Sequence, residues 1–267
     1  MEAMIRLSVA LAIFLAMISW EAFSPRRSLP IERRSRWLIN LGLAGFNMLM
    51  MRLTVGGVAY LTAMKATQQS FGLLNQFTSP LWFKILITLL FLDVAIYAQH
   101  VLAHQWQWLW RLHQVHHTDL EMDATTAVRF HPLEIMLSMA YKVLCIVLIG
   151  ANPLAVIAFE VILNATATFN HSNVYISPRL EKWLRYVLIT PDLHRIHHSV
   201  IPKETDSNYG FSLSCWDKLF KTFTPQSQSP QTEMAIGLAT FRNKDDLNFL
   251  RLLILPFQAL KKLKRLL

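Results

Sequence analysis

Five long apolar runs restrict the fold of this chain more than any other feature, because segments of about 17 to 25 apolar residues form membrane-spanning helices. Hydrophobic residues make up 53% of the 267 residues and charged residues only 16%, whereas soluble domains carry about a quarter of charged residues. Backbone polar groups inside a bilayer must pair within their own segment, which favours helices. The sequence therefore predicts an all-α, polytopic membrane helix bundle of about four or five transmembrane segments, at approximately residues 7–23, 37–61, 81–100, 133–149 and 154–169.

Arginines around the first run indicate how the chain is oriented. Arg6 precedes this run, whereas five arginines follow it within residues 24–36. The positive-inside rule places that loop in the cytoplasm and the N-terminus outside. No small-x-small cleavage pattern follows the run, so we interpret it as an anchor rather than a removed signal. Counting the crossings from this loop places residues 100–131, 171 and 194–198 on the cytoplasmic side.

The formal charge of +9 has the same explanation. The basic residues lie in short loops and at the C-terminus, beside the apolar runs, which is typical of membrane topology and of contact with anionic headgroups. We therefore expect a membrane partner and no nucleic acid. Cys145 and Cys215 form neither a C-x-x-C motif nor a disulfide framework.

Most of the ten histidines are grouped in boxes with helical spacing. Residues at i, i+3 and i+4 share one face of a helix, so each box directs its rings to one point. A lone histidine in an apolar protein is usually packed or hydrogen-bonded, but three boxes on one membrane face indicate a metal site. Imidazole suits iron, zinc, copper and nickel, so the ligand type alone does not name the metal. The boxes are His100 and His104; His113, His116 and His117; and His194, His197 and His198.

The first two boxes can share a centre only if the chain bends between them. At about 100° per residue, a straight helix through residues 100–117 would point them in nearly opposite directions. The bend is expected between Gln105 and Leu112, where the sequence has neither proline nor glycine. A helix turning along the membrane interface would suit the three tryptophans there, and we favour this aromatic belt over substrate stacking. They are Trp106, Trp108 and Trp110.

Two single histidines and two carboxylates complete the candidate site. His131 precedes Pro132, and His171 ends the fifth apolar run, so both are candidate ligands or neighbours of ligands. Asp93 lies two turns before His100, and Glu160 lies three turns before His171, each on the same helical face as its histidine. Carboxylates inside a membrane are candidates for function. Because they lie too deep to ligate the metal directly, we expect them to line a cavity or to support the ligands.

The motifs HVLAH, WRLHQVHH, RFHPLE, FNHSN, HRIHHS and ETDSNYGFSLSCWDKLF occur in this order. Together they resemble the fatty acid hydroxylase/sterol desaturase superfamily of membrane di-iron oxygenases, over about residues 80–225. The resemblance implies that the eight histidines of the boxes are metal ligands, and it matches His171 and His131 to two further family histidines. Some fatty acid hydroxylases have an H-x3-H pair ending at the position of His171. Here Ala167 takes the first place, and His131 is the candidate that compensates.

The resemblance also implies two iron ions, O2 as co-substrate and electrons from a separate donor of the reductase, ferredoxin or cytochrome type. We find no fused haem-binding, flavin or nicotinamide fingerprint. We therefore divide the chain into three regions. They are an N-terminal transmembrane region with the basic loop (residues 1–80), a catalytic domain with a cytoplasmic helical cap (81–225) and a basic amphipathic tail along the membrane surface (226–267). Because the chain is compact and lacks an endoplasmic-reticulum retention signal, we expect a bacterial inner membrane.

The implied reaction is hydroxylation of an unactivated C–H bond of a lipid, such as a fatty acyl chain or a sterol. Desaturation by the same site is the alternative, since both reactions begin with hydrogen abstraction. A zinc hydrolase of the membrane interface is less favoured, because H-E-x-x-H is absent and no box carries an acidic residue between its histidines. A metal transporter would have its ligands near the bilayer midplane rather than at one face.

Overall fold

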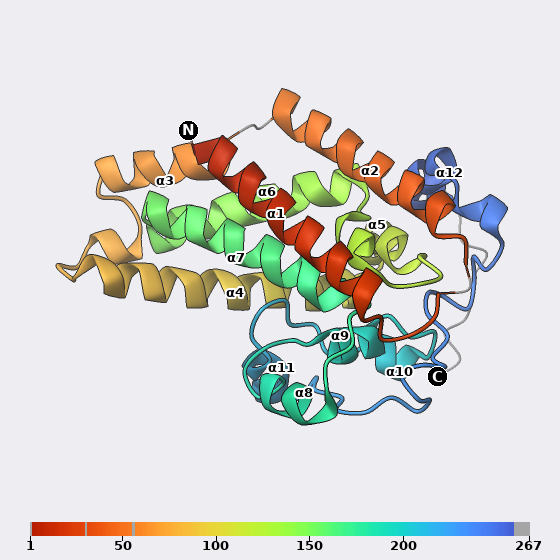
Figure 1. Ribbon diagram of the computed structural model, residues 1–267. Helices are drawn as coiled ribbons and strands as arrows, with labels where there is room; N and C mark the ends of the chain where they lie inside the picture. The colour runs from red at the N-terminus through yellow and green to blue at the C-terminus, as the bar shows by residue number, and fades with distance from the viewer. Residues whose placement is uncertain (1, 30, 55–56, 259–267) are drawn as a thin grey trace.

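The computed structural model describes residues 2–29, 31–54 and 57–258, and this part of the chain folds as helices joined by loops, with isolated bridges but no strand (Figure 1). Five helical segments in it are long and apolar enough to span a membrane, which confirms the predicted polytopic helix bundle. The long helices are α1 (Glu2–Phe23), α2 (Arg33–Thr54), α4 (Leu81–Gln105), α6 (Pro132–Ile149) and α7 (Pro153–His171).

The second predicted span is not one helix. Residues 37–61 were expected to be continuous, but α2 ends at Thr54, and a separate helix, α3 (Val58–Gln68), runs on into the predicted polar linker. Gly57 precedes α3 with φ at 73°, in the left-handed region that glycine adopts readily. This conformation is incompatible with an uninterrupted α-helix. Gly56, also part of the predicted span, lies outside the described residues.

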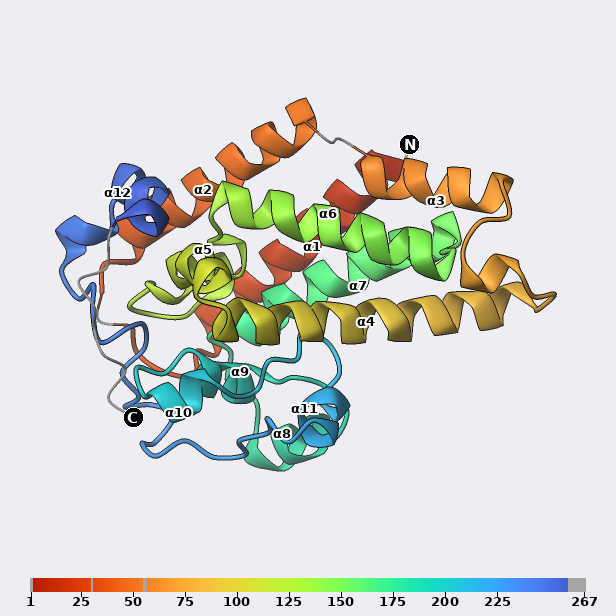
Figure 2. The ribbon, with the colours of Figure 1, turned by 180° about the vertical axis from the view of Figure 1, so that it is seen from behind.

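Helices α4, α6 and α7 run side by side and form the centre of the bundle (Figures 1 and 2). Their facing stripes bury Leu92, Ile96, Ile146, Val156 and Phe159 in one apolar core. Helix α3 covers α6 and α7, whereas α1 crosses α7 diagonally. The apolar stripe of each central helix therefore has a protein partner, while the remaining apolar faces are left for lipid.

The turn between α6 and α7 is closely packed at the end of the bundle away from the histidines. Gly150 has φ at 71°, and a Cβ placed on it would lie 2.8 Å from Asn75 Nδ2 and 2.9 Å from the carbonyl carbon of Gly72. We expect Gly150→Ala to lower the free energy of unfolding by about 1–3 kcal/mol, because the left-handed backbone and the contacts are both unfavourable. Thermal unfolding in detergent measures this. Gly45→Ala is the matched control, since no atom lies within 4 Å of its added methyl group.

A more polar region, residues 172–236, packs against one end of the bundle, and we call it the cap. It consists of turns and four short helices and lies beside the histidine-bearing ends of α4 and α7 (Figure 2). The short helices are α8 (Pro178–Leu184), α9 (Pro191–His197), α10 (Pro202–Thr205) and α11 (Cys215–Leu219). The predicted cap of short helices is therefore present.

The C-terminal segment returns to the bundle through η3 (Lys244–Leu247), α12 (Phe249–Ile254) and η4 (Leu255–Phe257). Leu252 and Leu255 are buried in a cluster with Leu43 and Val115, so this part of the predicted amphipathic tail packs on protein. Residues 259–267, which carry most of the basic residues of the tail, lie outside the described residues.

Candidate metal centre

The bend predicted between the first two histidine boxes is present at Trp106. Helix α4 ends at Gln105, α5 (Gln107–His117) begins at Gln107, and Trp106 between them has an extended backbone with φ −93° and ψ 115°. This single extended residue turns the second box towards the first. The rings of Trp106 and Trp108 are exposed, as an interfacial belt requires. Trp110 instead contacts the centre, with its ring 4.9 Å from that of His104.

Nine histidines from α4, α5, α7 and the α9 region converge into two groups. Within each group the ligand atoms lie within 4.8 Å of one another, and none of the nine residues is more than 4% exposed. One group has five members and the other has four. They are His100, His104, His113, His117 and His197, and His116, His171, His194 and His198.

Backbone carbonyls orient several of these rings through Nδ1. The Nδ1–H of His100 donates to the Tyr209 carbonyl at 2.7 Å, that of His197 to Ser207 at 2.8 Å, and that of His171 to Ala167 at 2.7 Å. A carbonyl oxygen only accepts, so Nδ1 carries the proton in each ring and Nε2 is left with a lone pair. This outer hydrogen bond is the usual support of a metal-bound histidine.

The lone pairs face one another at distances that suit ligands of one ion. His100 Nε2 lies 3.1 Å from His113 Nε2. His113 Nδ1 in turn donates to Glu134 at 2.6 Å, so neither Nε2 has a proton to share. Neighbouring ligands at a metal–nitrogen distance of about 2.0–2.1 Å lie about 3 Å apart. His116 and His171 repeat this arrangement at 3.0 Å. The residues therefore fit two metal ions, one in each group.

Burial keeps these rings in the state that binds metal. It lowers the pKa of His116, His117 and His198 well below the usual value, and the neighbouring histidines lower it further. Desolvation disfavours the charged imidazolium, so the rings are neutral near pH 7 and their lone pairs are free. The neutral rings can therefore bind metal cations without first losing a proton.

His131 is the one histidine that lies outside both groups. It caps the N-terminus of α6, where its Nδ1 accepts from the Leu133 N–H at 3.2 Å and its Nε2 donates to the Leu253 carbonyl at 3.1 Å. Both nitrogens are engaged, which corrects the expectation that His131 replaces a ligand missing at Ala167. The four-histidine group is assembled without it.

The two intramembrane carboxylates, Asp93 and Glu160, differ in what they contact. Asp93 accepts from the Trp216 indole N–H at 2.8 Å and from the Leu213 N–H at 3.3 Å, so it fastens the cap to α4. It does not line the cavity beside the centre, contrary to one of the two roles expected for it. Glu160 does line this cavity.

A buried polar network supports the second histidine box, and sequence reasoning missed it. Arg36 donates to Asp119 at 2.7 Å and to Asp123 at 2.7 Å. Arg129 donates to Asn40 at 2.7 Å, and its carbonyl accepts from His116 at 3.3 Å. In the sequence, Arg36 indicates only the orientation of the chain. Its charge at the start of an apolar run was also a signal that a buried acidic partner exists.

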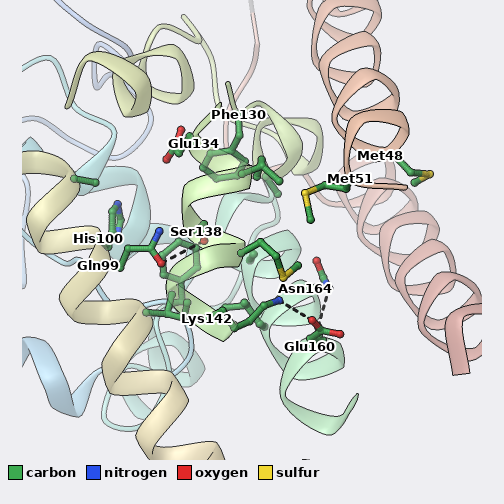
Figure 3. A pocket seen from close by; sticks show the side chains of 18 of the residues that line it. Met48, Met51, Gln99, His100, Phe130, Glu134, Ser138, Lys142, Glu160 and Asn164 are labelled. Atoms are coloured by element: carbon green, nitrogen blue, oxygen red, sulfur yellow. Dashed lines mark hydrogen bonds and ion pairs between the residues drawn. The ribbon is translucent and has the colours of Figure 1, made fainter. Parts of the chain in front are cut away.

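A cavity of about 590 Å³ extends from the centre into the helix bundle (Figure 3). His100 and His113 line one end, together with Phe130 and Glu134. The walls beyond come from α4, α6 and α7, with contributions from α1, from α2 and from Gly57 before α3, and they are mainly apolar. A lipid chain held here would therefore have one part of its length beside the histidine cluster.

Glu134 is expected to matter for metal binding. Replacing it by leucine removes the carboxylate that accepts the His113 Nδ1–H, so the ring loses its orientation. Loss of such an outer partner typically lowers metal affinity or activity by about 10- to 100-fold. Retention of added iron during dialysis against a chelator measures the effect. Ser138→Ala, one turn further along the same face of α6, should retain iron like the unmodified protein.

Comparison with known proteins agrees with this geometry. The sequence model described as fatty acid hydroxylase matches residues 85–222, which include all ten histidines. Ornithine lipid hydroxylase OlsE of Rhizobium tropici is 31% identical over 161 residues, 59% of this chain and 46% of the relative. Alkylglycerol monooxygenase of Homo sapiens is 32% identical over 153 residues, 56% of this chain and 32% of the relative.

Cholesterol 25-hydroxylase of Rattus norvegicus is 27% identical over 147 residues, which are 54% of this chain and 48% of the relative. The chain thus spans less than half the length of each of these three relatives. No solved structure matches the chain significantly.

Proposed function

This chain belongs to the fatty acid hydroxylase family, and we propose that it hydroxylates an unactivated C–H bond of a membrane lipid with two irons, O2 and electrons from a separate donor. One observation carries the proposal: a buried centre of nine histidines opens into a cavity among the membrane-spanning helices. The names of the relatives support it, since they are hydroxylases or monooxygenases with lipid substrates.

The two histidine groups would hold one iron ion each. When bound, the irons supply the activation of O2 and the oxidising power that amino-acid side chains lack. The chain itself orients the ligands: Glu134 holds the proton on His113 Nδ1, and the Tyr209 carbonyl does the same for His100. Phe130 stacks on the His116 ring with centroids 4.4 Å apart. Together with the apolar cavity wall, this ring excludes water from the reacting carbon.

We propose that the cap is cytoplasmic. The arginine-rich loop after α1 contacts it directly, since Arg26 pairs with Asp192 at 3.0 Å and Arg27 donates to the Met234 carbonyl at 2.7 Å. The loop and the cap are thus on the same side, and the positive-inside rule assigns that side to the cytoplasm. A soluble electron donor would reach the centre there. A bacterial inner membrane is the proposed location, in keeping with the relative from Rhizobium tropici.

Mass spectrometry of lipids tests the proposal. Cells that produce the protein or its His116→Ala variant are grown under ¹⁸O2. A lipid that gains one labelled oxygen only with the unmodified protein supports hydroxylation. A lipid that loses two hydrogens instead supports desaturation, and the absence of change in every lipid class contradicts lipid oxidation.

Metal analysis of the purified protein provides an independent test. We expect about one iron for each of the two histidine groups. Zinc binds imidazole sites tightly, so zinc alone in an overproduced sample decides nothing until iron has been supplied. Stoichiometric zinc with no iron-dependent activity after such reconstitution would count against an oxygenase and in favour of a hydrolase.

A further inference from the structure

The cavity beside the metal centre has an unusual lining at its far end. Three helices present regular stripes to it, with residues at i, i+3 or i+4 on one face of each helix. Near the histidines, Glu134 accepts from His113, and the walls beside it are apolar or carry small polar groups. Lys142 and Glu160 lie at the other end (Figure 3). The stripes are Ile96, Gln99, His100 and Ala103 of α4; Glu134, Ile135, Ser138, Met139 and Lys142 of α6; and Glu160, Leu163, Asn164 and Ala167 of α7.

The charged end is built around Glu160. Lys142 Nζ donates to one carboxylate oxygen of Glu160 at 2.6 Å, and Arg6 of α1 donates to the other (Figure 3 shows the lysine pair). Both partners of the lysine pair are mostly buried, with 12% and 10% of their side chains exposed. Arg52 near the end of α2 also lines the cavity. Among the described residues, the side chains of Arg6, Arg52 and Lys142 thus bring positive charge to the cavity that holds Glu160.

Holding the helices together does not by itself explain these charges. Ion pairs inside a membrane are costly, and apolar packing would join α1, α6 and α7 at least as well. All four side chains also line the cavity rather than a closed helix interface. Lys142 has three N–H donors, and its hydrogen bond to Glu160 uses one of them. The part of the cavity around Glu160 is thus rich in hydrogen-bond donors. The ligand group that complements it is an acceptor with negative charge.

We infer that this cluster, Arg6, Arg52, Lys142 and Glu160, binds an oxyanion of the lipid substrate, either a carboxylate or a phosphate. The inference rests on the proposed function, because it takes the cavity to be the substrate site. Arginine and lysine are the side chains that bind such oxyanions with charge-assisted hydrogen bonds. The cluster would then select anionic lipids over neutral lipids of the same length.

The position of the cluster also sets which carbon reacts. Lys142 follows Glu134 by eight residues on α6, and Glu134 contacts the ligand His113. At 1.5 Å per residue this separation is about 12 Å along the helix. An anion bound at Lys142 therefore brings a carbon in the interior of the lipid chain to the histidine cluster. Carbons next to the anionic group would stay out of reach.

Binding of defined lipids tests this without turnover. The purified full chain in neutral detergent is loaded with the fluorescent methyl ester of cis-parinaric acid, which carries no charge and is displaced by hexadecanoic acid or by its methyl ester. We expect Lys142→Met to weaken displacement by the acid about tenfold or more, the loss typical of one charged hydrogen bond. Displacement by the ester should stay unchanged, which shows that the variant is folded. Lys142→Arg keeps the charge and should bind the acid nearly as well as the unmodified protein.

A second arm identifies the source of the anion. Lysophosphatidic acid replaces hexadecanoic acid as competitor, and the lipid whose displacement depends on Lys142 carries the preferred oxyanion. Where Lys142→Met does not fold, Arg52→Met takes its place, because Arg52 is exposed and its removal leaves no cavity in the core. Equal effects on acid and ester, or no effect on either anionic lipid, overturn the inference.

The His116→Ala variant separates this inference from the proposed function. It should lose lipid oxidation but keep the charge-dependent binding, since His116 does not line the cavity. If the unmodified protein oxidises lipid but its lipid binding does not depend on Lys142, the inference is refuted and the proposed function stands. Binding that depends on Lys142 without any lipid oxidation refutes the proposed reaction and leaves an anionic-lipid site.

Discussion

Replacing His171 by alanine should remove one of the two proposed iron ions and abolish lipid oxidation. The His171 Nε2 lies 3.0 Å from the Nε2 of both His116 and His194, so its ring is central to the four-histidine group. Its loss leaves three imidazoles in that group, whereas the five-histidine group keeps all of its members. Even removal of an outer hydrogen-bond partner costs about 10- to 100-fold, so loss of a ligand should exceed the upper value.

The measurements are iron content by mass spectrometry and formation of oxidised lipid. We expect iron to fall from about two ions per chain to about one, in line with the two groups. His131→Asn is the matched control, because it alters the one histidine outside the cluster and keeps a side-chain acceptor for the α6 cap. Unchanged iron content in the His171 variant, or an equal loss in the control, would contradict the assignment of ligands.

Replacing Asp119 by asparagine should cause the largest loss of stability. The carboxylate of Asp119 accepts from Arg36 at 2.7 and 2.8 Å and from Asn40 at 3.0 Å, all in buried surroundings. Removing one partner of a buried ion pair leaves an uncompensated charge and typically costs about 3–5 kcal/mol. The same network supports the segment between α5 and α6, in which the Arg129 carbonyl accepts the Nδ1–H of His116.

The loss should depend on pH in a defined direction. The neighbouring Arg36 holds the pKa of Asp119 well below its usual range. The unfolded chain therefore binds this proton first, so the contribution is present above about pH 4 and disappears as the pH falls further. The unmodified protein should lose stability on acidification more steeply than the variant does.

Thermal unfolding in detergent between pH 3 and 8 measures both effects. Asp246→Asn is the control, since Asp246 and its partner Arg251 are 42% and 52% exposed and such pairs contribute less than about 1 kcal/mol. An Asp119 variant that is as stable as this control at pH 7 would show that the buried pair is replaceable.

Several features were predictable because they depend on neighbouring residues. The length of an apolar run decides whether it can cross a bilayer, and spacing of i, i+3 and i+4 decides which side chains share a face. The bend at Trp106 followed from the directions of the two boxes alone. The predicted second span was wrong in being continuous, because the helix is broken at Gly57. A glycine inside an apolar run should therefore be weighed as a possible helix break together with the hydropathy of the run.

The amino-acid sequence by itself determined the helical class, the number of apolar segments and the gathering of histidines at one end of the bundle. These properties are local and sum along the chain. Only the tertiary structure decided which histidines share a group, that His131 lies outside, that Asp93 fastens the cap and that Arg6 and Lys142 meet at Glu160. Each of these outcomes is a contact between distant segments, and such contacts are set by how whole helices pack, which no local pattern encodes.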